Sequence, residues 1–227
     1  MMALVWLALA LAIPVEDVTL PNGVRVIVSV DRAAGAIETA IAPDRSIVVV
    51  VGNVEPEAAR APYAGWARPS PAPSPPPGVE GESWQVTEGS PSLTVEWTAP
   101  ADGDSLLAAA LLGGIERCGA VWRWAPDDGW PPERRRALDA MVERWVRPSP
   151  KEVLAAREAC TRWAASPTAR LRAERLLSVT LATGNPRLYR ELPERCAHLD
   201  AAALSSLARA LSRQARRVRL VTPRDAP

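Results

Sequence analysis

The chain has 227 residues, with 23 Pro and 13 Gly, and its formal net charge is +1. This length suits one large domain or two small ones. Because 48% of the residues are hydrophobic and 23% are charged, the chain can bury a core, and global disorder is excluded. A net charge near zero provides no field that would attract nucleic acid or an anionic membrane surface.

The sequence contains a single histidine, His198. A zinc hydrolase site usually takes two or three histidine ligands, or cysteines in their place. The three cysteines, Cys118, Cys160 and Cys196, form no C-x-x-C pair, and the sequence has no phosphate-binding glycine motif and no G-x-S-x-G motif. We therefore predict no metal site, no cofactor and no catalytic residue in this chain by itself.

The N-terminal residues 1–13 are predicted to be a signal-peptide-like segment. The apolar run Ala3–Ile13 is shorter than the about 20 residues of a membrane-spanning helix, and Ala10–Ala12 resembles a cleavage site. A buried strand or helix is the alternative. Export predicts a periplasmic or cell-envelope location and no transmembrane span in the mature chain. There, three cysteines allow one disulfide, and the sequence leaves the pairing open.

Residues 14–67 are predicted to form a β-rich unit. The turn signal Pro21–Gly23 precedes valines that alternate from Val24 to Val30, which predicts a hairpin. The run Ser46–Asn53 is continuously β-branched, which is typical of a strand covered on both faces. Pro56 then predicts the first turn of a short helix, where its missing N–H costs nothing.

Residues 68–82 are rich in Pro and Ser and predict an extended linker, with a polyproline ligand as the alternative. Residues 83–227 are predicted to be an α+β domain, with a mixed or antiparallel sheet and helices packed on one face. Strands are predicted at residues 83–87, 93–98, 118–125 and 218–222. Helices are predicted at residues 104–116, 131–146, 166–183 and 187–196, after the capping box Ser149–Glu152, and after Asp200.

Four stretches of the chain, taken in order, resemble one known family. They are Val18–Asp31, Asp44–Ala61, Leu93–Ile115 and Arg147–Thr222. Together they are similar to the pitrilysin/insulinase-type metallopeptidases, the H-x-x-E-H inverzincins. The resemblance implies a shortened, degenerate version of a metallopeptidase half, in which residues 14–67 are a remnant of the N-terminal unit and residues 83–227 resemble the non-catalytic C-terminal half.

The chain departs from the family where the catalytic helix would lie. Family members carry H-x-x-E-H on a helix shortly after the hairpin, so that two histidines bind zinc and the glutamate activates water. Here Arg32–Ala42 is the whole connection to the next strand, and it contains no histidine. Glu38 in this connection is predicted to be a solvated loop charge.

A second departure concerns the arginine and tyrosine that hold substrate in the second half of family members. Arg117 and Arg123 lie near the corresponding stretch, but the only tyrosines, Tyr63 and Tyr189, are elsewhere. The resemblance therefore implies that both catalytic segments are missing.

Other residue pairs have a structural and a functional interpretation. Cys196 and His198 form a conceivable nucleophile pair, but residues two apart on a helix do not face each other, so packing or exposure is predicted. Trp122 and Trp124 share one face of a strand and are predicted to fill the core; an aromatic peptide-binding strip is the alternative.

Two groups of arginines are predicted to be structural. Arg134–Arg136 lies among acidic residues and is predicted to be a solvated helix end. Arg216, Arg217 and Arg219 are predicted to protect the last strand as an edge strand of the sheet.

These observations favour a non-catalytic, exported protein that is a partner or accessory subunit of a zinc peptidase of the same family. A stand-alone peptide-binding or structural module of the cell envelope is the alternative. A zinc peptidase that takes its ligands from another chain is the least favoured interpretation.

Overall fold

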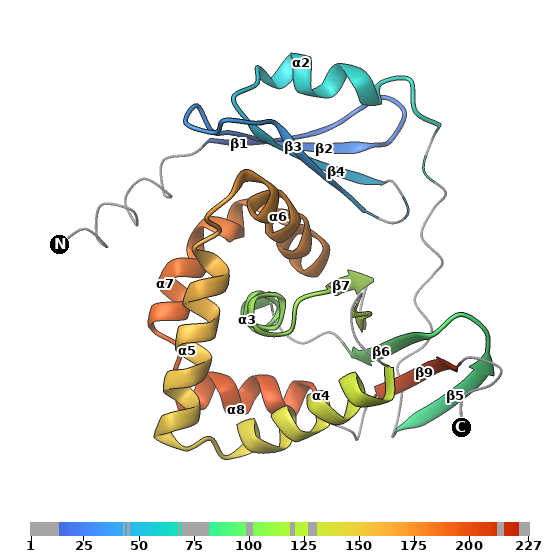
Figure 1. Cartoon of the computed structure of the whole chain (residues 1–227), viewed down its shortest axis with the longest axis vertical. Coiled ribbons are helices and arrows are strands. Elements are labelled where there is room, and N and C mark those ends of the chain that lie inside the picture. Colours follow the sequence, from blue (N-terminus) through green and yellow to red (C-terminus); the bar gives the residue numbers. More distant parts are fainter. Residues whose placement is uncertain are drawn as a thin grey trace.

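The computed structural model describes residues 14–42, 44, 46–67, 69, 82–98, 102–118, 121–126, 131–212 and 216–222. The strands form two separate sheets, one at the top and one at the lower right of Figure 1, and most of the helices lie beside the second sheet. The predicted signal-peptide-like segment and nearly all of the predicted linker lie outside the described residues.

The first sheet, sheet A, has the strand order β1-β2-β4-β3. Its strands are β1 (Val15–Thr19), β2 (Arg25–Val30), β3 (Glu38–Ile41) and β4 (Ile47–Gly52). The first two form the predicted antiparallel hairpin, and β4 runs parallel to β2 as an interior strand. The prediction for Glu38 was wrong, because this residue begins β3, which pairs with β4 instead of forming a loop.

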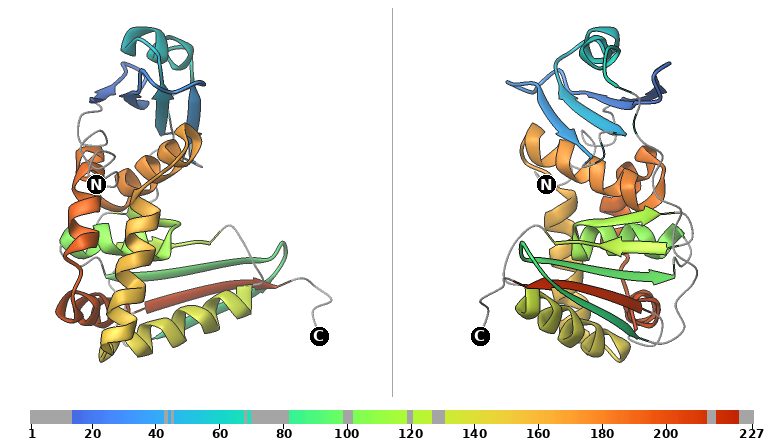
Figure 2. Two further views of the ribbon diagram at one scale, coloured as in Figure 1. Left: turned by 60° about the vertical axis from the view of Figure 1, so that its left-hand side comes forward. Right: turned by 90° about the vertical axis from the view of Figure 1, so that its right-hand side faces the viewer.

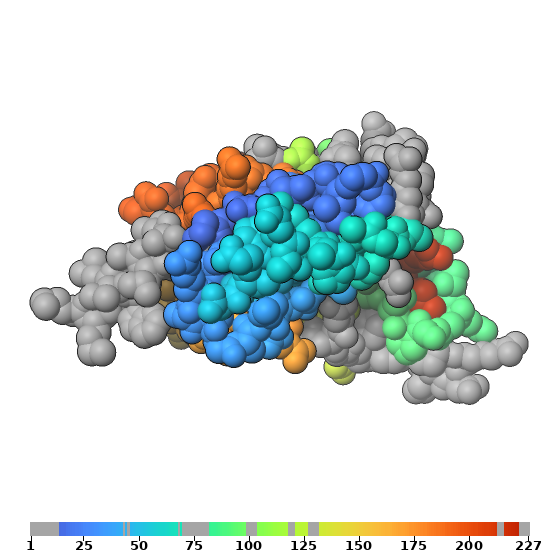
Figure 3. All heavy atoms as spheres, turned by 90° about the horizontal axis from the view of Figure 1, so that it is seen from above, coloured from blue at the N-terminus to red at the C-terminus, as the bar shows by residue number. Residues whose placement is uncertain are grey.

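Both faces of sheet A are covered. One face packs against α2 (Pro56–Arg60) and η1 (Ala61–Tyr63) through four buried valines, Val26, Val28, Val48 and Val50. Figure 3 looks down on this side and shows the segment around α2 lying across the sheet. The other face, with Ile27 and Val49, packs on Leu176 of α6 (Ala169–Thr183). A helix from late in the chain thus closes the N-terminal sheet, and Figure 1 shows α6 directly beneath it.

The second sheet, sheet B, has the strand order β5-β9-β6-β8-β7. Its strands are β5 (Ser83–Glu88), β6 (Ser92–Thr98), β7 (Ile115–Cys118), β8 (Val121–Trp124) and β9 (Arg216–Thr222). The β5–β9 pair is parallel and the others are antiparallel. The α+β class with mixed sheets is confirmed, although the strands form two sheets.

The predicted boundaries between residues 104 and 125 were wrong. Residues 115 and 116 were predicted to end a helix and 118–125 to be one strand, but α3 (Asp102–Leu112) stops earlier and two strands follow. The cause is a pair of glycines, since Gly113 and Gly114 have φ angles of 64° and 53°. Residues with a side chain rarely adopt this left-handed backbone conformation, whereas glycine adopts it readily. The helix therefore ends at these glycines, and β7 can begin.

The remaining helices are α4 (Pro131–Val146), α5 (Pro150–Ala164), α7 (Leu192–Ala197) and α8 (Ala201–Ala210), with the 3₁₀ turn η2 (Pro186–Glu191). Of these helices, α5, α7 and α8 contact α3, while α4 packs against α8 and the strands β6 and β9 (Figure 2). The predicted capping box of Ser149 and Glu152 opens α5. The helix α6 begins later than predicted, because Thr168 and not Ser166 is its cap.

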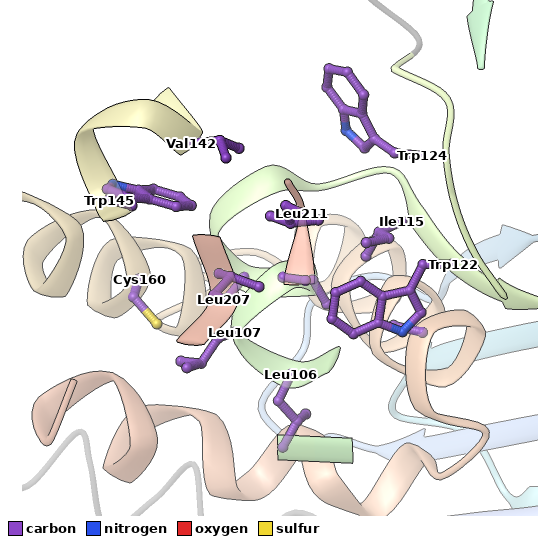
Figure 4. Close-up of a cluster of buried hydrophobic side chains, with 14 of the residues drawn as sticks. Leu106, Leu107, Ile115, Trp122, Trp124, Val142, Trp145, Cys160, Leu207 and Leu211 are labelled. Carbon is purple, nitrogen blue, oxygen red and sulfur yellow. The ribbon is translucent and has the colours of Figure 1, made fainter. Parts of the chain in front are cut away.

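The main core lies between these helices and sheet B (Figure 4). Two of its fully buried indoles have acceptors for their N–H groups: Trp122 Nε1 donates to Ser105 Oγ at 3.1 Å, and Trp97 Nε1 donates to the Leu211 carbonyl at 3.0 Å. Such pairing removes the penalty of burying a polar N–H. Across the described stretches, no helix combines the length and the apolar character that crossing a membrane requires.

Candidate functional site

The structure contradicts a Cys–His nucleophile. Cys196 forms a disulfide with Cys160, and both residues are fully buried. His198 Nδ1 lies 2.9 Å from the Glu194 carbonyl oxygen, within its own helical turn. The disulfide resolves the pairing that the sequence left open, while the side chain of Cys118 lies outside the described residues.

No three histidine, cysteine or acidic side chains in the described ranges are grouped so that they could hold a metal ion. The two tryptophans of β8 fill the core, as predicted, since Trp122 is fully buried and Trp124 is 3% exposed. Arg123 between them points to the opposite face of sheet B, where it bonds Glu96 at 2.9 Å and Glu116 at 3.1 Å. These ion pairs thus link the three neighbouring strands β6, β8 and β7.

Tyr189 lies at the junction between sheet A and the helices. Its hydroxyl donates to Ser166 Oγ at 2.6 Å, and the Arg175 guanidinium donates to the same oxygen at 2.9 Å. Burial raises the pKa of Tyr189, although the Ser166 hydrogen bond and the nearby Arg172 and Arg175 oppose this shift. Burial also lowers the pKa of Arg175.

Ser166 in this group has a φ angle of 29°, an uncommon conformation for a residue with a side chain. Its hydroxyl lies 3.5 Å from the Trp163 carbonyl oxygen, which accepts its proton, and no described side chain is placed to take that proton as a base. An activated serine needs such a base. Tyr189, Ser166 and Arg175 therefore form a structural hydrogen-bond network where sheet A meets the helices. The ion pair of Arg172 with Asp31 lies across the same contact.

The structure contradicts the prediction that Arg216 protects a sheet edge, because β9 is an interior strand. Arg216 is 1% exposed and binds two carboxylates, with Nε 2.8 Å from Glu82 Oε2 and Nη1 2.7 Å from Asp139 Oδ1. Arg135 completes this cluster, with Nη2 3.1 Å from Glu82 Oε1 and Nε 3.6 Å from Asp139 Oδ2. The middle residue of the arginine triplet thus belongs to the cluster and not to a solvated helix end.

This arginine cluster, Glu82, Arg135, Asp139 and Arg216, lies beside the edge strand β5. The Arg135 guanidinium carbon is 3.7 Å from the ring centre of Trp84, whose Nε1 donates to Glu82 at 2.5 Å. A cation held over an indole is attracted by the ring's negative face. Trp84 is nevertheless 41% exposed, so the cluster holds an aromatic ring in place at a sheet edge that has no further strand beside it among the described residues. This edge is the candidate functional site, and it was not predicted because its residues come from three separate stretches of the chain.

No protein-family model and no curated protein matches this chain. Similar solved structures include a protease from Helicobacter pylori, at 13% identity and a TM-score of 0.42, covering 78% of this chain and 55% of that one. A peptidase M16 inactive domain from Pseudomonas fluorescens is similar at 14% identity and a TM-score of 0.40, covering 82% and 56%. Pitrilysin is similar at 15% identity and a TM-score of 0.41, covering 80% and 25%.

The chain spans about half the length of the first two structures. The structures to which this chain is similar therefore include M16-type and pitrilysin-type peptidases and an inactive domain. The sequence resembles the same class of protein.

Proposed function

We propose that this chain is a non-catalytic, pitrilysin/insulinase-like protein that acts as a partner or accessory subunit of a zinc peptidase. The observation that carries the proposal is that both faces of sheet A are closed by this chain itself. A zinc helix that follows the opening hairpin would need one of these faces.

The face of sheet A opposite α2 is filled by α6. Ala173 and Leu176 of this helix are 1% and 0% exposed, and they contact Ile27, Val49 and Val51 of the sheet. A helix supplied by another chain would have to displace α6 and expose this cluster to water. The interpretation as a zinc peptidase with ligands from another chain is therefore disfavoured.

Two features of the molecule are consistent with a partner role. A subunit without zinc ligands can position a peptide or complete a chamber without chemistry of its own. Each sheet also ends in edge strands whose outer N–H and C=O groups have no strand beside them among the described residues. Such edges favour pairing with another chain. Export, inferred from residues 1–13, would place both proteins in the periplasm or cell envelope.

The alternative, a stand-alone peptide-binding or structural module of the cell envelope, is favoured by the edge strand β3. Ile41 at the end of this strand is 44% exposed, and Ile37, directly before the strand, is 55% exposed. An extended peptide added to β3 could bury both side chains.

Co-expression with an intact H-x-x-E-H peptidase from the same genome, followed by size-exclusion chromatography and a peptidase assay, tests the proposal. We expect the two chains to co-elute and this chain to change the peptidase rate. Separate elution with an unchanged rate would refute the partner role and favour the module. A variant with Ile37→Lys and Ile41→Lys tests β3 as the contact, and Leu154→Lys, an exposed position on α5, is the matched control.

A further inference from the structure

One disulfide joins two helices of the main core. Cys160 near the end of α5 and Cys196 near the end of α7 are both 0% exposed. Figure 4 shows Cys160 among the buried side chains of this core. Reducing a disulfide requires a thiolate to reach one of its sulfur atoms. Because neither sulfur is accessible in the folded chain, the bond is formed or cleaved only while α7 is separated from α5.

The helix α7 has few other attachments. It has six residues, too few for a helix that is stable by itself in water. Its buried side chains are Leu192 and Cys196, so the disulfide is one of two groups that anchor it. The other buried residues of α5 are Ala156 and Ala164, whose small side chains bury little apolar area. The docking of α7 therefore depends strongly on the bond.

Arg157 provides a second connection between the same two elements. Its guanidinium donates two hydrogen bonds, at 2.9 and 3.3 Å, to the carbonyl of Leu199, which follows α7. Hydrogen bonds to a charged group change a folding equilibrium by about 10- to 150-fold. Closing a loop with a sequence separation of 36 changes it by about a thousandfold. The disulfide is therefore the stronger of the two connections.

We propose that oxidation of Cys160 and Cys196 completes the folding of this chain. Small domains have folding equilibrium constants of about 10³ to 10⁸, so a chain that lacks a thousandfold contribution is marginally stable. While both cysteines are thiols, α7 is attached weakly and the sulfur atoms are accessible. A dithiol–disulfide oxidoreductase forms the bond at this stage, and the packing of α7 then protects the bond from reduction.

The oxidation is a balanced disulfide exchange. The thiolate of one cysteine attacks the disulfide of the oxidoreductase, which forms a mixed disulfide and releases one thiolate of that enzyme. The thiolate of the other cysteine then attacks the sulfur of the first, so that the bond within this chain forms and the mixed disulfide breaks. The oxidoreductase leaves as a dithiol with the two electrons, and its sulfur atoms take up the two protons that the cysteines lost.

The bond also bears on the compartment in which the chain folds. Disulfides form and persist in oxidising compartments such as the periplasm and are rare in the cytosol. The disulfide therefore supports export on grounds that are independent of residues 1–13. The inference rests on the proposed function for the location alone, because it requires no partner peptidase.

Reduction of the purified full chain tests the folding step. In a Cys118→Ser background, we expect dithiothreitol to leave the bond intact in buffer and to cleave it in urea. The unfolding equilibrium constant of the reduced chain should be about a thousandfold larger, and reoxidation should restore the original value. The matched control, which also carries Cys160→Ser and Cys196→Ser, should unfold like the reduced chain with and without dithiothreitol. Equally fast cleavage with and without urea, or equal unfolding constants for the oxidised and reduced chains, would overturn the proposal.

Thiol trapping in the source cells tests the location. Cells are acidified, the proteins are alkylated under denaturing conditions, and the labelled peptides are identified by mass spectrometry. We expect Cys160 and Cys196 of the natural chain to carry no label unless a reductant is added first. Label on these two residues without reductant would overturn oxidation in the cell. This result would leave co-elution with a peptidase unaffected, so the failure of this inference and the failure of the partner role are distinguishable.

Discussion

Replacing Leu176 of α6 by alanine tests whether this helix closes the N-terminal sheet. Leu176 is fully buried and packs against Ile27, Val49 and Val51. The change removes about three carbon atoms, each contributing about 0.8 kcal/mol, and leaves a cavity between a helix and a sheet that cannot readily collapse. We therefore expect the free energy of unfolding to fall by about 3 to 4 kcal/mol.

Urea denaturation followed by circular dichroism measures this loss, and hydrogen exchange followed by mass spectrometry locates it. Because α6 contacts both sheet A and the main core, amides of β2 and β4 should exchange faster in Leu176→Ala than in the wild type. Leu154→Ala, at a position that is 54% exposed, should change stability by less than about 0.5 kcal/mol. A loss below about 1 kcal/mol in Leu176→Ala, with unchanged exchange in β2 and β4, would refute the shared role of α6.

Three further predictions concern buried polar groups and the disulfide. Arg216→Met leaves Arg135 as the remaining arginine on Glu82 and Asp139 and should lower the free energy of unfolding by about 1.5 to 3 kcal/mol, whereas Arg219→Met on the exposed side of the same strand should have little effect in urea denaturation. The raised pKa of Tyr189 means that the folded state holds this proton more tightly, so the contribution of Tyr189 to stability should be constant below about pH 10 and be lost as the pH rises further; Tyr189→Phe should show a smaller fall above about pH 10 in parallel titrations. Replacing Cys160 and Cys196 by serine opens a loop with a sequence separation of 36 and should cost about 4 kcal/mol in thermal or urea unfolding under oxidising conditions; an unchanged midpoint would contradict the disulfide.

Local signals in the sequence predicted most of the elements. The Asn-Gly turn and the capping box before α5 depend on neighbouring residues, and both are confirmed. The run of valines in β4 likewise predicts an interior strand, because only a strand covered on both faces can be apolar throughout.

Long-range pairing explains most of the failures. The position of β9 between β5 and β6 depends on strands far away in the sequence, so Arg216 was assigned to an edge although it is buried among carboxylates. The strand β3 was missed for a local reason, because it has four residues and its sequence lacks a clear apolar alternation. The packing of α6 against sheet A could not be predicted either, because a helix that buries two faces has no simple amphipathic pattern.

We predict that this chain does not hold a catalytic zinc by itself. The most direct test is the zinc content of the purified chain, determined by mass spectrometry of the metal, together with a peptide-cleavage assay. We predict far less than one zinc per chain, no cleavage, and the same results for His198→Ala. Stoichiometric, tightly bound zinc, with cleavage that a chelator abolishes and added zinc restores, would contradict the account.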